Sequence, residues 1–148
     1  MKIAVACDHG GYALKNVVLQ TILEQGHQAL DLGTSGMESV DFPDYAEKAG
    51  KALSDGSADR AILMCGSGVG ICIAANKIKG VYASTCHDTY SAHQGVEHDH
   101  MNALCLGGRI IGDELAKEIV KAFLAAVPVQ AERHLRRVNK IKAIETKN

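Results

Sequence analysis

The 148-residue sequence contains no tryptophan, and aromatic residues make up only 4% of it. The aromatic stacking platform of a protein that binds single-stranded nucleic acid is therefore not expected. The formal net charge is -1, so no overall field draws the chain to nucleic acid or to a membrane surface. No apolar run approaches the roughly 18 residues that a membrane-spanning helix needs, and the first apolar run is too short for a signal peptide. We expect neither a nucleic-acid partner nor a membrane partner.

The five cysteines are an odd number, and no two of them form a C-x-x-C pair. Four of them lie in or at the ends of apolar runs, namely Cys7, Cys65, Cys86 and Cys105. This usage indicates reduced thiols rather than a disulfide framework or a zinc ribbon. We therefore expect a cytoplasmic protein in which most of these side chains act as small buried hydrophobes.

Short apolar runs alternate with longer amphipathic segments along the chain. The pattern predicts strands at residues 2–7, 28–32, 60–65, 80–86 and 103–108. It predicts a helix on the stripe Leu14, Val17, Val18 and Ile22, and two helices at about 45–53 and 69–76. It also predicts a helix over 113–127, on the repeat Leu115, Ile119 and Phe123, and a basic helix over 130–144. Residues 41–44 are predicted as a turn, and the stretch up to Glu97 as helical or irregular. Buried strands that alternate with helices indicate one α/β domain over residues 1–148, a three-layer α/β/α Rossmann-like sandwich around a five-stranded parallel sheet.

Ligands of such sheets bind outside the carboxyl ends of the strands. The predicted strand ends carry the segments Asp8–Gly11, Cys65–Gly68, Cys86–Asp88 and Gly107–Arg109. We therefore expect these polar and glycine-rich segments to meet at one edge of the sheet.

The third predicted strand ends in a G-x-G-x-G loop that leads into a helix. A dinucleotide loop would follow the first strand and would need glycine at Ile71, although Asp88 stands at a suitable distance for such a site. A P-loop is excluded, because no Gly-Lys-Ser/Thr follows. Exposed amides before a helix bind negative charge, either a phosphate or a transient oxyanion; alternatively, the glycines serve only a tight turn. Cys65 at the entrance favours the oxyanion, because a thiol beside such amides is readily ionised and supplies a base or nucleophile.

The segment at residues 97–102 is the densest polar cluster. His98 and His100 are candidate metal ligands of a hydrolase, but alternating residues of an extended segment point to opposite sides, and no motif supplies further ligands. The other interpretations are solvated loop histidines, or a histidine that acts as a general acid.

The predicted basic helix places Arg133, Arg137 and Lys140 on one face, and Leu135, Val138 and Ile141 on another. Its basic face is either simply solvated or a clamp for one small phosphate, for which the fork of an arginine is well suited.

Five segments of the chain carry a resemblance to a known family: "CDHGGYALK", "DFPDYA", "CGSGVGICIAANK", "EHDHMNALCLGGRIIG" and "ERHLRRV". In this order, and over essentially the whole chain, they resemble the type B ribose-5-phosphate isomerases, relatives of the galactose-6-phosphate and allose-6-phosphate isomerases. The resemblance implies an aldose–ketose isomerase that works through an enediolate without metal or cofactor. It also implies dimers, often paired into tetramers, whose active sites are built from two subunits. Ribose 5-phosphate and ribulose 5-phosphate are the expected substrates, and a six-carbon sugar phosphate is the alternative. A nucleotide-binding module without chemistry remains a less favoured interpretation.

The resemblance also assigns roles to residues of this chain. It implies that Cys65 moves a proton between C1 and C2, that Ser67 supplies a hydroxyl near the same atoms, and that His98 assists ring opening. The backbone at Gly66, Gly68 and Gly70 would form the anion hole. Sugar and phosphate contacts would come from Asp8, His9, Asp99, Arg109, Arg133 and Arg137.

The chain departs from the family pattern after the histidine that would open the ring. Asp99 stands where an asparagine is expected, and His100 where an acidic residue is expected. We therefore expect an altered sugar preference or an altered pH dependence. Family members without the cysteine use a carboxylate on the glycine loop, but Ile71 and Cys72 offer none here, which leaves Cys65 as the evident base.

Overall fold

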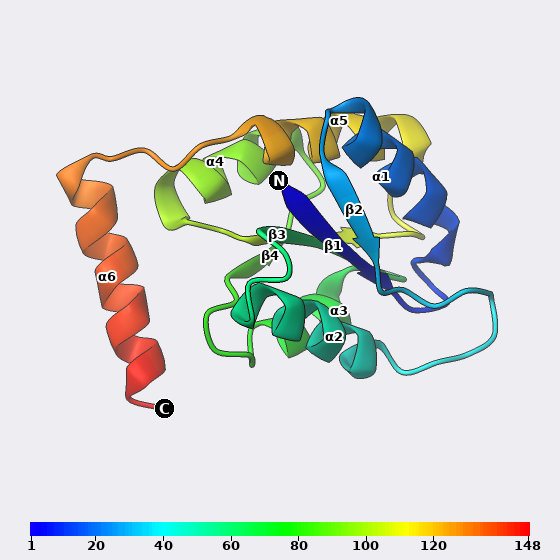
Figure 1. The fold of residues 1–148 in the computed structure, drawn as a ribbon, viewed down its shortest axis with the longest axis horizontal. Coiled ribbons are helices and arrows are strands. Elements are labelled where there is room, and N and C mark those ends of the chain that lie inside the picture. The colour runs from blue at the N-terminus through cyan, green and yellow to red at the C-terminus, as the bar shows by residue number, and fades with distance from the viewer.

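Five parallel strands form the middle layer of the structure, a computed structural model that describes residues 1–148 (Figure 1). The strands are β1 (Lys2–Cys7), β2 (Gln28–Asp31), β3 (Arg60–Cys65), β4 (Ala83–Thr85) and β5 (Ala103–Gly107). They lie in the order β2-β1-β3-β5-β4, and each neighbouring pair is parallel. The predicted five-stranded parallel sheet is thus confirmed.

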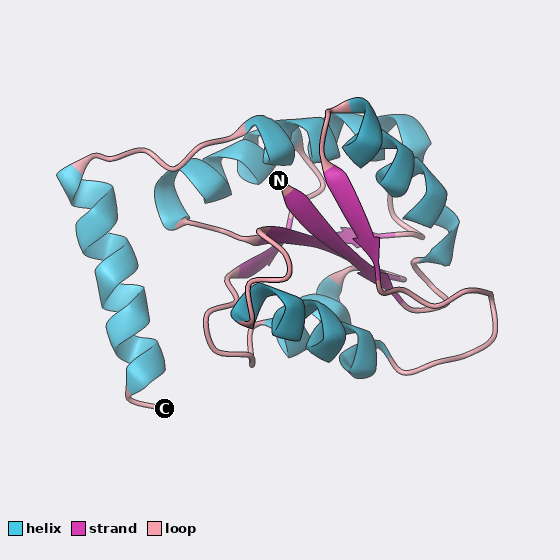
Figure 2. Ribbon diagram, viewed as in Figure 1, coloured by secondary structure: helices cyan, strands magenta, loops and turns pink.

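Helices cover both faces of the sheet (Figure 2). They are α1 (Tyr12–Glu24), α2 (Phe42–Ser54), α3 (Val69–Ala75), α4 (Thr89–Asp99), α5 (Asp113–Ala125) and α6 (Glu132–Thr146). Helices α1, α4 and α5 pack on one face, and α2 and α3 on the other. The three-layer α/β/α prediction is therefore also confirmed, while α6 stands to one side of the sandwich.

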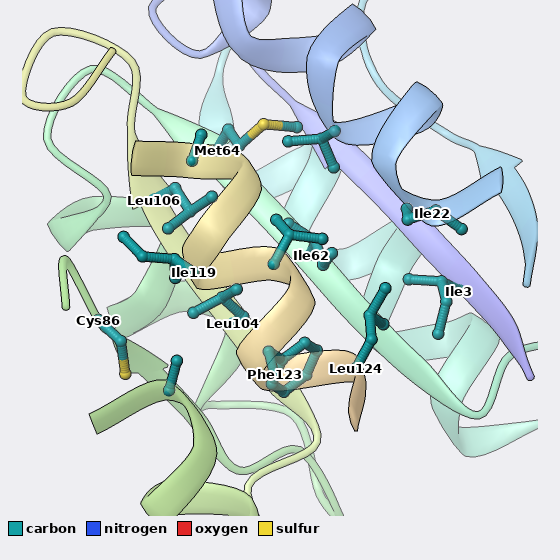
Figure 3. Close-up of a cluster of buried hydrophobic side chains, with 14 of the residues drawn as sticks. Ile3, Ile22, Ile62, Met64, Cys86, Leu104, Leu106, Ile119, Phe123 and Leu124 are labelled. Carbon is teal, nitrogen blue, oxygen red and sulfur yellow. The ribbon is translucent and has the colours of Figure 1, made fainter. Parts of the chain in front are cut away.

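Large aliphatic side chains fill the space between the sheet and α5 (Figure 3). Ile62 and Leu104 from the strands meet Ile119 and Phe123 of α5, and all four are completely buried. Each such side chain contributes about 1.5–3 kcal/mol by leaving water. Because side chains alternate along a strand, Met64 belongs to this core, whereas Cys65 faces the other layer with α2 and α3. The alternation thus fixes the side of the sheet on which the thiol lies.

Two predicted boundaries are wrong for local reasons. Helix α2 begins at Phe42, so residues 41–44 form its first turn, with Asp41 at the N-cap and Pro43 where a missing amide hydrogen costs nothing. Strand β4 covers only residues 83–85 of the predicted 80–86. The Tyr82 amide instead donates to the side chain of Asn102 (2.8 Å), outside the strand ladder.

Two predicted helix faces are also rotated. Lys15, predicted to point away from the buried stripe, is 8% exposed, and its Nζ contacts the Thr34 carbonyl and Asp31 Oδ2, each at 2.8 Å. Leu115, predicted within the stripe of α5, is 42% exposed. A repeat of four residues drifts around a helix of 3.6 residues per turn, so burial shifts to Ala116 and Val120 at this end.

Helix α6 is tied to the sandwich at its two ends. Near its start, the linker amide of Val129 donates to the Glu97 carbonyl at 2.8 Å. Near its end, Glu145 accepts from the Gly80 amide (2.7 Å) and the Tyr82 hydroxyl (3.3 Å). Of the predicted apolar face, Val138 is buried but Ile141 is 40% exposed. The helix therefore leaves apolar surface uncovered within one chain. None of the helices, α6 included, has the length and the apolar character that a membrane span requires.

Candidate active site

The carboxyl ends of β1 and β3 lie side by side at the point where the strand order reverses. The chain leaves β1 towards β2 on one side, whereas β3 pairs with β1 on the other. The Asp8 amide, directly after β1, donates to the Met64 carbonyl of β3 at 3.2 Å. Such a switch point leaves a crevice above the sheet where ligands of open α/β domains bind.

Cys65 lies at this point with its sulfur against the start of α3. The side chain is 5% exposed, and the Gly68 amide donates to Sγ at 3.2 Å. Gly68 forms the N-cap of α3 with φ 80°, a left-handed conformation that favours glycine. The expected contact between the thiol and the loop amides is therefore present.

Neighbouring loops at this edge touch backbone to backbone. A Cβ added to Gly10 would lie 2.8 Å from the Gly66 nitrogen, and a Cβ added to Gly108 would overlap the Gly10 carbonyl. The Gly108 amide donates to the Cys65 carbonyl at 2.9 Å. Glycine is thus required here for close approach, which makes the loops after β1, β3 and β5 one rigid unit.

Ser67 lies in the loop after β3, and Arg109 reaches this loop from the one after β5. A Cβ added to Gly66 would lie 3.1 Å from an Arg109 guanidinium nitrogen, so the guanidinium covers this glycine. Ser67 Oγ accepts from the Val69 amide at 3.2 Å, which leaves its own proton available to another acceptor. The loop that carries the thiol therefore also presents a hydroxyl and helix-end amides, and a guanidinium covers one of its glycines. Gly70 lies in the first turn of α3, as the predicted helix over residues 69–76 implies, and gives room to the Phe42 ring.

Asp8 and His9 reach the same edge from β1. One carboxylate oxygen of Asp8, Oδ1, accepts from the amides of Gly10 (2.8 Å) and Gly11 (3.1 Å). The Val40 amide donates to His9 Nδ1 at 3.2 Å, so the neutral ring carries its proton on Nε2. We name Asp8, His9, Arg109 and the loop Cys65–Gly70 the carboxyl-edge group.

His98 and Asp99 lie elsewhere, on the last turn of α4. The prediction of an extended segment at these residues is wrong, because helix α4 continues to Asp99 and ends at His100, which has a φ of 56°. The ring of His98 stacks on His134 of α6, with 4.1 Å between ring centroids and 10° between ring planes. Gln94 Nε2 approaches His98 Nδ1 at 3.0 Å.

Arg133 and Arg137 join His98 through their position on α6. Burial lowers the pKa of His134, and His98, Arg133 and Arg137 act in the same direction. The neutral form of His134 is therefore favoured beside the two guanidinium groups. We name His98, Asp99, Arg133 and Arg137 the α4–α6 group.

The two groups lie at opposite ends of the strands: the carboxyl-edge group at the carboxyl ends, and the α4–α6 group towards the amino ends. Helix α4 starts after the carboxyl end of β4 and runs back, so that Asn102, just beyond it, accepts from the Ala61 amide at the start of β3. The four steps between the five residues of β5 alone separate the two edges by about 13 Å, at about 3.3 Å per step. The expectation that the strand-end segments meet at one edge is therefore correct, and His98, which is not part of those segments, lies at the opposite edge.

Two residues at or near the carboxyl edge received no role from the sequence. Hydrogen bonding from the Cys105 thiol, helped by Thr85, lowers the pKa of Cys72 to about 6 against the opposing effect of burial. His87 Nε2 accepts from the Gly107 amide at 2.9 Å. No periodicity could have revealed the contact with Cys105, because it joins a helix to a strand 33 positions further along.

The other cysteines fit the expectation of buried hydrophobes. All five are free thiols, and burial raises the pKa of Cys7 to about 11.

No group of three or more His, Cys, Asp or Glu side chains is placed to hold a metal ion. A hollow of about 730 Å³ runs along α2 and includes Val40 beside His9 but no residue of the carboxyl-edge group.

Comparison with known proteins gives the fold and the site a family. Residues 3–141 match the model of the Ribose/Galactose Isomerase family. Ribose-5-phosphate isomerase B of Escherichia coli is 44% identical over 144 residues, which are 97% of this chain and 96% of that protein. D-erythrulose-4-phosphate isomerase of Pectobacterium atrosepticum is 39% identical over 127 residues, 85% of this chain and 84% of that protein.

Solved structures superpose on this chain over nearly its whole length. Ribose-5-phosphate isomerase B of Clostridium thermocellum superposes with a TM-score of 0.95 and 45% identity, covering 99% of both chains. The Mycoplasma genitalium enzyme, solved with bound ribulose-5-phosphate, has a TM-score of 0.92 and 36% identity and covers 99% of this chain and 97% of its own. The chain therefore belongs to the ribose/galactose isomerase family, and it is an aldose–ketose isomerase of sugar phosphates.

Proposed function

We propose that this chain interconverts ribose 5-phosphate and ribulose 5-phosphate, with Cys65 as the group that moves the proton. The observation that carries the proposal is the position of Cys65 Sγ, 3.2 Å from the Gly68 amide in a loop covered by Arg109. A base beside an oxyanion site is what abstraction of a proton next to a carbonyl requires. The substrates named for the relatives from Escherichia coli and Mycoplasma genitalium support the five-carbon sugar.

The proposed proton transfer uses only residues of the carboxyl-edge group. The Cys65 thiolate takes the hydrogen from C2 of the open-chain aldose, and the electron pair moves to the carbonyl oxygen at C1. Amides of the loop Gly66–Gly70 and the free Ser67 proton stabilise the resulting enediolate oxygen. The Cys65 thiol then returns the proton to C1 while the hydroxyl hydrogen on O2 passes to O1, which yields the ketose and restores the thiolate. No redox partner is needed, because the two carbon atoms exchange oxidation states.

The α4–α6 group acts on the same substrate molecule. In the proposal His98 assists opening of the furanose ring, and Arg133 and Arg137 hold the phosphate with charge-assisted hydrogen bonds. Asp8 retains Oδ2 for a sugar hydroxyl, since the loop amides occupy only Oδ1. His9 and Arg109 add donors from the carboxyl edge.

The separation of the two groups leads to a shared active site. Cys65 acts at C2 and His98 at the ring oxygen, atoms that are a few bonds of about 1.5 Å apart. Within one chain the strands of the sheet keep these side chains far beyond that reach. We therefore propose a homodimer, with tetramers as pairs of dimers, in which each site combines the carboxyl-edge group of one chain with the α4–α6 group of the other. The exposed apolar residues Ile141 and Ile144 of α6 are then covered by the partner.

Complementation tests this arrangement directly. Cys65→Ala and His98→Ala chains are each expected to be nearly inactive. In a dimer that carries one of each, one site has both changes and the other has neither, so a fully exchanged equal mixture recovers about 25% of wild-type turnover. A mixture no more active than the separate variants would show that each chain builds its own site.

Turnover of a panel of aldose phosphates tests the substrate. Purified enzyme in EDTA is assayed with four-, five- and six-carbon aldose phosphates, and the highest kcat/KM is expected for ribose 5-phosphate. A higher value for a six-carbon substrate would instead support an allose- or galactose-phosphate isomerase, and activity lost to EDTA would support a metal enzyme. The free thiols are the reason for proposing a reducing, cytoplasmic location.

A further inference from the structure

We propose that Gln94 is a positioning residue that holds His98 as the tautomer protonated on Nε2, and that Asp99 sets the orientation of Gln94. The contacts between these residues stand independently of the reaction. Their catalytic consequence rests on the proposed role of His98 in ring opening.

The three side chains meet on one turn of α4. Gln94 precedes His98 by four residues, so the two lie on the same face of the helix. Gln94 Nε2 lies 3.0 Å from His98 Nδ1 and 3.3 Å from Asp99 Oδ2. A single amide nitrogen thus serves an imidazole and a carboxylate.

The carboxylate decides which way the amide of Gln94 faces. An amide can be rotated so that its oxygen and nitrogen exchange places with little change in shape. In the rotated form, Gln94 Oε1 would face Asp99 Oδ2, and neither atom has a hydrogen to share. With the nitrogen in place, one of its two hydrogens goes to Asp99 Oδ2 and the other to His98 Nδ1. The ionised carboxylate therefore fixes Gln94 as a donor towards His98.

A donor at Nδ1 determines the tautomer of His98. Because Nδ1 accepts from Gln94, the proton of the neutral ring lies on Nε2. Stacking on His134, with centroids 4.1 Å apart and ring planes within 10°, holds the plane of the ring. Gln94 occupies one nitrogen and His134 one face, so the Nε2–H is the polar end left to the substrate.

The tautomer selects which half of the ring-opening step His98 performs. Ring opening requires a proton donor at the ring oxygen and an acceptor for the hydrogen of the hydroxyl on C1. With its proton on Nε2, neutral His98 donates a hydrogen bond that stabilises the ring oxygen as its bond to C1 breaks, while the C1 hydroxyl hydrogen reaches that oxygen through solvent; as the other tautomer His98 would accept the hydroxyl hydrogen instead. Gln94 and Asp99 thus assign His98 the donor role.

This arrangement explains a departure from the family pattern. Asp99 stands where the resemblance leads to an asparagine. An asparagine side chain offers both a donor and an acceptor, so it would leave either orientation of Gln94 possible. The carboxylate of Asp99 therefore serves the orientation of Gln94, whatever it contacts in the substrate.

NMR of the free enzyme tests the tautomer without any turnover. Histidine labelled with ¹⁵N gives ring correlations that distinguish protonated from unprotonated nitrogens, and a His98→Ala spectrum assigns His98 among the seven histidines. We expect Nε2 protonated in the wild type and Nδ1 protonated in Gln94→Glu, whose carboxylate only accepts. Asp99→Asn should give a mixture. Gln20→Glu adds the same charge at an exposed position of α1 and should leave the protonation pattern of His98 unchanged. Protonation of Nδ1 in the wild type would overturn the proposal. The same protonated ring nitrogen in the wild type and in Gln94→Glu would overturn it as well.

Kinetics separates positioning from a general structural effect. Erythrose 4-phosphate cannot close a furanose ring, because its O4 carries the phosphate. Gln94→Glu should lower kcat/KM for ribose 5-phosphate by about 10- to 100-fold, while any turnover of the four-carbon substrate stays within about 2-fold of wild type. Equal losses on both substrates would show a merely structural role. A wild type that isomerises no sugar phosphate would refute the proposed function and leave the NMR result to decide the tautomer.

Discussion

The carboxyl-edge group and the α4–α6 group are held together by different parts of the chain. The first is fixed by backbone atoms, since the Gly10 and Gly108 loops pack against the loop of Cys65 without room for a side chain. The second is fixed by side chains on the ends of two helices, through the stack of His98 on His134 and the contacts of Gln94. Under the proposed function, the oxyanion cradle is complete within one chain, whereas the side chains proposed for ring opening and phosphate binding act on the substrate held by a second chain.

The largest effect is expected from the thiol of the carboxyl-edge group. Cys65→Ala should lower kcat by about 10³-fold or more, because a positioned base is lost, while the thermal midpoint changes little. Cys72→Ser is the matched control, since this thiol is also on the glycine-loop side but has no role in the proposed proton transfer; its kcat should stay within a few-fold of wild type. Near-normal turnover by Cys65→Ala would remove the proposed base.

The corresponding change in the α4–α6 group should appear in KM instead of kcat. Arg137→Ala should raise KM by about 10- to 100-fold, as expected for one lost hydrogen bond between charged groups, because the phosphate is held equally in ground and transition states. Arg136→Ala is the control, since Arg136 lies one position away on α6 and pairs with Glu132 at 2.8 Å. Equal KM values for the two variants would remove Arg137 from the phosphate site.

A stability measurement tests whether the carboxyl-edge group is fixed by backbone contacts. Gly108→Ala places a Cβ on the Gly10 carbonyl and should lower the free energy of unfolding by about 1–3 kcal/mol, the usual cost of overpacking. Gly112→Ala meets open space at a negative φ and should change it little. Urea unfolding of both variants makes the comparison, and equal midpoints would contradict the close packing of these loops.

The smallest effect on activity is expected from a change at Cys72, whose thiol has a lowered pKa. With a pKa lowered to about 6, this thiol is mostly thiolate at pH 7 and loses that form as the pH falls through 6. In a Cys65→Ala background, the rate of iodoacetamide labelling at Cys72, followed by mass spectrometry, should be half-maximal near pH 6 and level above pH 7. A rate that keeps rising tenfold per pH unit up to pH 8 would show an ordinary thiol.

Local patterns predicted the fold better than its details. The alternation of apolar runs and amphipathic segments gave the five strands and most helices, because these periods reflect burial on a sheet or along a helix. Lys15 escaped prediction because its burial depends on Asp31 and Thr34, which come from β2 and the loop after it. The pattern up to Glu97 does not choose between helical and irregular backbone, so it does not predict the contact between Gln94 and His98.

The sequence by itself determined that Cys65 enters a glycine loop at a helix start, and that the carboxyl ends of β1, β3 and β5 meet above one edge of the sheet. These features follow from strand period and from the parallel direction of the strands, both of which are local or topological. Only the tertiary structure decided that His98, Arg133 and Arg137 lie at the other edge, because that depends on where α4 ends and how α6 packs on it. It also decided that Asp99 reaches Gln94, since side-chain orientation on a helix end is set by three-dimensional contacts and leaves no period in the sequence.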